Sequence, residues 1–114
     1  MSQDVIDRKE LLAVRLPNWN VSTADVREVT LGPGIRAGRH LHPCAVVGYI
    51  VSGSALYQID GQPTQTLTTG SAFYEPPSTV IAEFGNASDA DPLVFVAIYL
   101  LNGDQDLITM LPPR

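Results

Sequence analysis

The sequence predicts an all-β fold, a single-domain sandwich or barrel, from three observations. Apolar residues make up 45% and charged residues 17% of the 114 residues, which is enough apolar material for one packed core. Nine Gly and nine Pro are spread along the chain and interrupt nearly every stretch that might form a helix. Short β-branched and aromatic runs instead recur about every 8–12 residues with turn residues between them, which is typical of sandwiches and barrels.

Strands are expected after an N-terminal arm. Residues 1–20 are assigned to the arm, which is either extended or contains a helical turn, and residues 21–114 to the barrel domain. Trp19 is expected to anchor the arm to the barrel surface. The strand patterns are β-branched or aromatic runs and apolar–polar alternation, each bounded by Gly or Pro. The expected strands cover residues 25–31, 46–51, 54–60, 64–68, 72–74, 79–84 and 93–101.

Net charge and cysteine content restrict the partners and the compartment. The formal net charge is −5 and no run of Lys or Arg occurs, so we expect no nucleic-acid partner. One cysteine cannot form an internal disulfide, and nothing therefore requires an oxidising compartment. The longest apolar run, residues 93–101, is much shorter than the roughly 20 residues of a membrane span, and the N-terminus is polar. We expect a cytoplasmic protein with no membrane partner.

The chain has two histidines, and they lie together as His40-Leu41-His42. Residues i and i+2 of a strand point to the same face, so both imidazoles can converge on one metal ion. The same pattern also suits two hydrogen-bonded histidines without a metal. Cys44 continues the alternation, but Pro43 interrupts the strand, and we expect a small buried or turn cysteine there.

The sequence around the histidines, GIRAGRHLHPCAVVGYIVSG, resembles the first motif of the cupin superfamily, G-x5-H-x-H-x3,4-E-x6-G. The later segment GSAFYEPPSTVIAEFGN echoes the second motif, G-x5-P-x-G-x2-H-x3-N, through Gly70, Pro76 and Asn86. The two motifs occur in the expected order, and the resemblance covers residues 26–100. It implies a jelly-roll barrel, also called a double-stranded β-helix, of the small cupin 2-like type.

The resemblance also implies a metal site that has lost ligands. Cupin metal sites typically use three His and one Glu. By the spacing of the motifs, Val46 stands at the Glu position and Ile81 at the position of the second-motif His. His40 and His42 are then the remaining two of four ligands, and two imidazoles alone bind divalent metals weakly.

Two carboxylates are candidates to serve such a site. Glu83 lies two residues beyond Ile81 and shares its face in a regular strand. It would then complete a 2-His-1-carboxylate metal site with the two histidines, or else lie solvated at the barrel mouth. Glu75 faces inward if Phe73 does, as a candidate general base, or else is a strand-end carboxylate bonded to the backbone.

The barrel cavity is expected to be lined from inward-facing strand positions. A glycine at position 48 either leaves room for a ligand or lets the sheet bend, while Tyr49 points outward. Tyr57 and Tyr99 either line the cavity or pack in the core. The expected pocket residues are Val46, Gly48, Tyr57, Phe73 and Ile81.

Three functions remain open at this point. In the first, the metal site is degenerate and the barrel binds a small molecule, as the apolar Val46 and Ile81 favour. The alternative is a metal-dependent enzyme, dioxygenase- or isomerase-like, that uses the two histidines and a displaced carboxylate such as Glu83 to hold Fe, Mn, Ni or Zn. In the third, the barrel is a scaffold for interaction or regulation. The resemblance further implies a homodimer in which the N-terminal arm covers a sheet edge of the partner.

Overall fold

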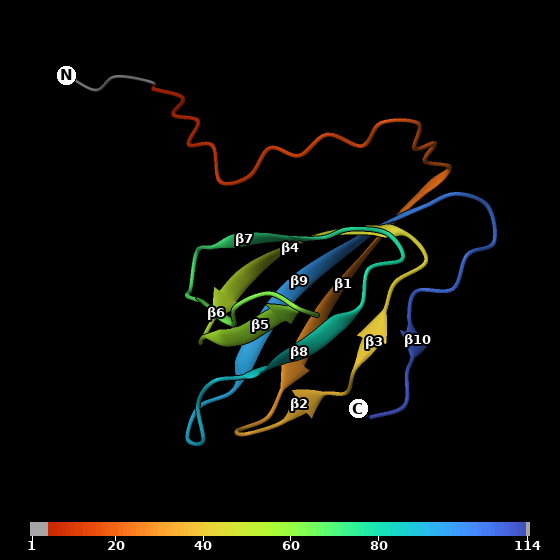
Figure 1. Ribbon diagram of the computed structural model, residues 1–114. Helices are drawn as coiled ribbons and strands as arrows, with labels where there is room; N and C mark the ends of the chain where they lie inside the picture. Colours follow the sequence, from red (N-terminus) through yellow and green to blue (C-terminus); the bar gives the residue numbers. More distant parts are fainter. Residues whose placement is uncertain (1–4, 114) are drawn as a thin grey trace.

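The computed structural model describes residues 5–113, which form β-strands and no helix, as predicted (Figure 1). No membrane-spanning helix is therefore present in the described part of the chain. All seven expected strands occur, with bounds within two residues of those expected. The strands are β1 (Thr23–Leu31), β2 (Arg36–Ala37), β3 (His40–Leu41), β4 (Ala45–Ser52), β5 (Ala55–Ile59), β6 (Gln65–Leu67), β7 (Ala72–Glu75), β8 (Ile81–Asn86), β9 (Leu93–Leu101) and β10 (Thr109–Met110).

The strands form two antiparallel sheets that face each other as a jelly-roll-like barrel (Figure 1). The first sheet has the order β1-β9-β4-β7. The second has the order β10-β3-β8-β5-β6, and β2 also pairs with β8. Strands β2, β3 and β10 have two residues each, too short to give a sequence pattern, and all three lie in the second sheet.

Side-chain alternation along β4 places one face of the first sheet in the core. Val46 and Ile50 are fully buried, whereas Tyr49 between them is 41% exposed, which confirms the predicted inward register. The inner face of this sheet forms rows across its strands. Val46 lies opposite Glu75 of β7 on one side and Tyr99 of β9 on the other.

Gly48 occupies the next inward position of β4, where it receives the ring of Phe73. A Cβ atom at position 48 would lie 2.1 Å from Cζ of Phe73, far inside van der Waals contact. The space above the glycine is therefore filled by protein, which corrects the expectation that it makes room for a ligand. Phe73 in turn packs against Phe84 and Phe95, with ring centroids 5.2 and 6.1 Å away.

A β-bulge in β8 changes which side chains face the core. Ile59 of β5 pairs with Ile81, but Gln58 pairs with Glu83, so Ala82 is an extra residue. The extra residue reverses the alternation beyond it. Ile81 and Phe84 therefore both point into the core, and Glu83 does not. The expectation that Glu83 shares the face of Ile81 is wrong for this reason.

Asn86, the second-motif asparagine, is a buried link between loops. Its Nδ2 donates to the carbonyl oxygens of Leu31, Gly32 and Asp91 at 3.2, 3.1 and 2.7 Å. Its Oδ1 accepts a hydrogen bond from the Ser88 amide at 2.9 Å. These bonds tie the end of β1 to the loop between β8 and β9, so the residue has a structural role here.

The N-terminal arm, described from residue 5, contains no helix or strand before β1 and runs past the β4 and β7 side of the first sheet (Figure 1). Trp19 anchors its end, because the indole Nε1 donates to the carbonyl of Leu100 at 3.0 Å and the ring packs on the core. The radius of gyration is 15.4 Å, above the roughly 13 Å of a compact chain of about this length. The excess reflects the arm.

Substituting Gly48 tests the packing of the Phe73 ring. Gly48→Ala is expected to destabilise the protein by about 1–3 kcal/mol, because the added methyl group must displace the aromatic ring. Gly32→Ala is the matched control, since its Cβ would meet Ile35 at an ordinary 3.7 Å. Urea unfolding measures both free energies, and equal stabilities of the two variants would contradict the packing described.

Candidate metal centre

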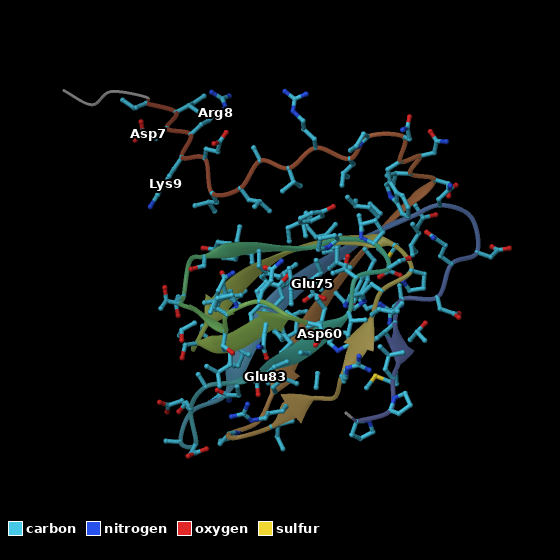
Figure 2. All side chains as sticks on the ribbon, in the orientation of Figure 1. Asp7, Arg8, Lys9, Asp60, Glu75 and Glu83 are labelled. Atoms are coloured by element: carbon cyan, nitrogen blue, oxygen red, sulfur yellow. The ribbon has the colours of Figure 1, made fainter. Side chains whose placement is uncertain are left out.

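Three buried side chains meet between the two sheets: His40, His42 and Glu75. Their exposed fractions are 3, 5 and 3%, and the three ligand atoms lie within 4.8 Å of one another. The Nε2 atoms of His40 and His42 lie 3.7 and 2.6 Å from Oε1 of Glu75. Figure 2 shows Glu75 inside the barrel. The histidines thus converge as the sequence predicted, and Glu75 is the carboxylate that joins them.

Short pieces of backbone fix these side chains. His40 lies on β3 and pairs with Ile81 of β8, and the carbonyl of His42 just beyond accepts a hydrogen bond from the Ser78 amide at 2.8 Å. Glu75 is the last residue of β7, two residues after the inward Phe73. The site therefore lies where β3 and β7 approach each other from opposite sheets.

Both imidazole rings are oriented by main-chain carbonyls. Nδ1 of His40 lies 2.6 Å from the carbonyl oxygen of Gly38, and Nδ1 of His42 lies 2.6 Å from that of Leu107. A carbonyl only accepts, so each Nδ1 carries the proton. The neutral rings then point the Nε2 lone pairs at Glu75, which is the arrangement found in metal-ligating histidines.

The charges of the cluster favour an ionised carboxylate. Burial by itself raises the pKa of Glu75, but the two imidazoles outweigh it and hold this pKa below its usual value. For His42, burial lowers the pKa, and the Glu75 carboxylate more than compensates, so the pKa is raised. The ring and the carboxylate therefore form an ion pair when His42 is protonated.

His40, His42 and Glu75 also fit a divalent cation, which would take the place of the proton on Nε2 of His42. Two imidazole nitrogens and one carboxylate oxygen are a donor set suited to first-row transition metals. Oε1 of Glu75 is fully buried, and its neighbours among the described residues are the two Nε2 atoms, at 2.6 Å (His42) and 3.7 Å (His40). A buried carboxylate oxygen that faces two imidazole nitrogens is a suitable ligand for a metal ion.

The other candidate ligands lie outside the cluster. The Glu83 carboxylate forms an ion pair with Arg36 of β2 near the surface, apart from Glu75 in Figure 2. Cys44 is buried, as expected, but is not part of the ligand group. Burial raises the pKa of its thiol, which disfavours the thiolate that binds metals.

A cavity of about 140 Å³ adjoins the cluster. Val46 and Phe73 line it as predicted, while Gly48, Tyr57 and Ile81 are buried without lining it. The Tyr57 hydroxyl instead donates to the carbonyl of Tyr74 at 2.6 Å. The lining residues are Val29, Leu31, Ala37, His40, His42, Val46, Phe73, Glu75, Phe84, Phe95, Ala97, Tyr99 and Ile108.

The C-terminal segment, residues 102–111, completes the site. It supplies the carbonyl of Leu107 to His42 and the side chain of Ile108 to the cavity. Gln105 holds the segment in place by donating from Nε2 to the carbonyl of Pro43 at 3.1 Å. No sequence pattern indicates this segment, because its contribution is mainly a backbone carbonyl. The sequence did indicate Glu75, because it lies two residues after Phe73 and therefore points to the same face of the strand.

The family model of the cupin domain matches residues 27–99. No curated protein matches the chain in sequence. A cupin-like protein from Thermotoga maritima has a similar solved structure, with a TM-score of 0.69 and 27% sequence identity. The similarity covers 79% of this chain and 65% of that protein, so this chain spans less than two thirds of the relative's length.

Two further solved structures show the same fold. The DMSP lyase DddQ from Ruegeria pomeroyi has a TM-score of 0.68 at 17% identity, over 79% of this chain and 44% of the lyase. A Klebsiella pneumoniae protein with a double-stranded β-helix domain has a TM-score of 0.65 at 21% identity, over 87% of this chain and 90% of that protein. At these identities the likeness concerns the fold alone. Because the family model covers more than half of its residues, the chain belongs to the cupin domain family.

Proposed function

We propose that this protein is a metal-dependent cupin that binds and activates a small molecule in its barrel. In this proposal His40, His42 and Glu75 hold one divalent cation at the polar end of the cavity. The observation that carries it is the orientation of the histidines. Both Nδ1 atoms are bound to carbonyls, so both Nε2 atoms and a buried carboxylate face one point.

Three protein ligands leave coordination positions open for ligand oxygen atoms or water. A bound cation would supply Lewis acidity, and two nitrogens with one carboxylate suit Fe(II), Mn(II), Ni(II) or Zn(II). The protein itself holds the rings in one tautomer, and aromatic side chains line the cavity beside the cluster. A reaction of the dioxygenase or isomerase type is consistent with such a centre.

A second candidate function is small-molecule binding without a metal. The 2.6 Å contact between His42 and Glu75 favours it, since a protonated imidazole can neutralise the carboxylate without a cation. The two candidates differ in whether ligand binding requires metal.

Metal content distinguishes the two candidates. Wild-type protein incubated with Fe(II) or Mn(II) is expected to retain about one metal ion per chain after gel filtration. His42→Ala and Glu75→Ala are expected to weaken metal binding by more than the roughly 10- to 100-fold that loss of an outer hydrogen-bond partner costs. Glu83→Ala is the matched control, because this carboxylate pairs with Arg36 outside the cluster. Elemental analysis and metal-dependent thermal shifts provide the measurements.

Two results would count against the metal proposal. Wild-type protein without metal, yet with ligand protection against thermal unfolding, would favour the metal-free binding site. Equal metal loss in Glu83→Ala and Glu75→Ala would place the cation elsewhere.

We also propose that the protein functions as a homodimer joined through the N-terminal arm. Leu11, Leu12 and Val14 of the arm and the outer face of the first sheet border a gap of about 450 Å³. The arm pairs with no strand and packs loosely on the sheet. Few contacts within one copy therefore compensate for the conformational entropy that the arm loses when it is ordered. The apolar side chains around the gap are those that a second copy would bury.

Deleting residues 1–15 is expected to convert the dimer into a monomer that still binds metal, since none of the described arm residues, from residue 5 on, lies in the candidate metal centre. Sedimentation equilibrium and elemental analysis test the two parts. Tyr49→Lys, on the outer face beside the arm, is expected to weaken the dimer as well, whereas Thr66→Lys on the exposed strand β6 is its control. A full-length protein that is monomeric at micromolar concentration would contradict the dimer.

A further inference from the structure

We infer that the C-terminal segment, residues 102–111, is a lid on the cavity, and that its closed position keeps Nε2 of His42 directed at Glu75. Gln105 is the positioning residue that holds the lid closed. The lid itself follows from the exposure of the cavity and from the contacts of the segment. Its effect on metal binding rests on the proposed function, because it concerns a cation held by His40, His42 and Glu75.

The mouth of the cavity lies beside the C-terminal segment. Ile108 of this segment is the most exposed lining residue, at 41%, and most of the others are buried. Val29 and Leu31 of β1 and Ala37 of β2 are half-buried. β1 and β10 are edge strands of the two sheets, and among the described strands no pairing joins these edges. The cavity therefore reaches the surface between β1 and the C-terminal segment, where the Ile108 side chain covers it.

Few interactions hold the C-terminal segment on the side of the barrel (Figure 1). β10 pairs with β3 over two residues, and the Leu111 amide donates to the carbonyl of Arg39 at 2.9 Å. Within residues 102–111, all but Gln105, Leu107 and Leu111 are exposed, and Leu107 packs against the core. Segments with little buried surface and short backbone pairing open locally while the rest of the protein stays folded. The C-terminal segment can therefore leave the barrel without unfolding of the two sheets.

Gly103 is a hinge at the point where the segment leaves β9. Its φ of +68° lies in the left-handed region that favours glycine, and no atom beyond its chain neighbours lies within 4 Å of the place that a Cβ would take. The amide of Gly103 donates to Oγ of Ser22 at 2.9 Å, which ties the turn itself to the barrel. Rotation of the backbone beyond Gly103 therefore moves the segment without moving β9.

Gln105 joins the segment to the backbone beside His42. Its Nε2 donates to the carbonyl of Pro43, the residue after His42, at 3.1 Å. Its Oε1 accepts a hydrogen bond from the amide of Asn102 at 2.9 Å, so both ends of the side-chain amide are used. Leu107 follows two residues later, and its carbonyl oxygen lies 2.6 Å from Nδ1 of His42. The hydrogen bonds of Gln105 therefore set the position of this carbonyl relative to the ring.

The position of the lid and the state of His42 are coupled through the Leu107 carbonyl. In the closed lid this carbonyl accepts the Nδ1 proton of His42, whereas an open lid removes the acceptor and frees the ring to rotate or to change tautomer. Nδ1 of His40 bonds instead to the carbonyl of Gly38, which lies outside the segment. A cation that requires both Nε2 atoms therefore binds the closed lid more tightly, and its binding shifts the lid toward closure.

Full-length, metal-free protein provides the first test, through NMR of the two ring Nδ1 protons. Gln105→Ala removes two hydrogen bonds of the lid, and exchange of the His42 proton with solvent is expected to become roughly tenfold faster. The His40 proton, held by a carbonyl outside the lid, is expected to keep its rate. Gln58→Ala is the matched control, because Gln58 also donates to a main-chain carbonyl but lies on β5, outside the lid.

Release of Mn(II) provides the second test. Loaded full-length protein is mixed with excess EDTA, and the metal that remains bound is measured after timed desalting. Gln105→Ala is expected to speed release by about the same factor as it speeds the exchange of the His42 proton, because both processes need an open lid. Gln58→Ala is expected to release Mn(II) at the wild-type rate.

A disulfide across the lid provides the opposite variant. Leu41 and Thr109 are directly paired between β3 and β10, and paired residues have Cα atoms about 4.5–5.5 Å apart, within the range that a disulfide spans. Leu41→Cys with Thr109→Cys, made together with Cys44→Ala, is expected to release Mn(II) several-fold more slowly when oxidised than when reduced. Mn(II) prefers oxygen ligands to thiolates, so the reduced thiols do not compete for it.

The possible outcomes separate this inference from the proposed function. Protein that retains no Mn(II) before EDTA is added would refute the metal centre, and the histidine exchange then decides on the lid alone. Equal acceleration of the His40 and His42 protons in Gln105→Ala would overturn the lid. Bound Mn(II) whose release is changed neither by Gln105→Ala nor by the disulfide would overturn the lid and leave the metal centre standing.

Discussion

The chemistry of this barrel depends on two hydrogen bonds that bring a histidine ring to a main-chain carbonyl. Gly38, just before β3, holds His40, and Leu107, just before β10, holds His42. Because carbonyl oxygens only accept, both rings keep their protons on Nδ1 and present Nε2 to Glu75. Two short irregular segments, rather than the long strands, thus determine whether the site can bind a metal.

The long strands determine what surrounds the three candidate ligands. Cross-strand pairing places Tyr99, Val46 and Glu75 in one row, and Gly48 accommodates the Phe73 ring in the next. These rows line a small cavity whose polar groups lie at one end. The apolar Val46, found where a cupin usually has a ligand, becomes part of the cavity wall.

The sequence predicted the strands and the inward face of β4 because regular alternation has a period of two residues, and the resemblance to the cupin motifs indicated a jelly-roll barrel. It failed for Glu83 because one extra residue, Ala82, reverses the alternation in β8. A bulge of this kind depends on pairing with β5 and leaves no local pattern. The sequence also could not predict that the carbonyl of Leu107 binds His42. Every residue has a carbonyl oxygen, and only the tertiary fold places this one beside the ring.

The most direct measurement of the central claim is anomalous diffraction from crystals of the Co(II)-loaded protein. The account predicts one strong peak bonded to Nε2 of His40, Nε2 of His42 and a carboxylate oxygen of Glu75, at about 2.0–2.2 Å from each. It also predicts that both Nδ1 atoms remain hydrogen-bonded to their carbonyls. A peak elsewhere, or no peak with His42 still in direct contact with Glu75, would contradict it.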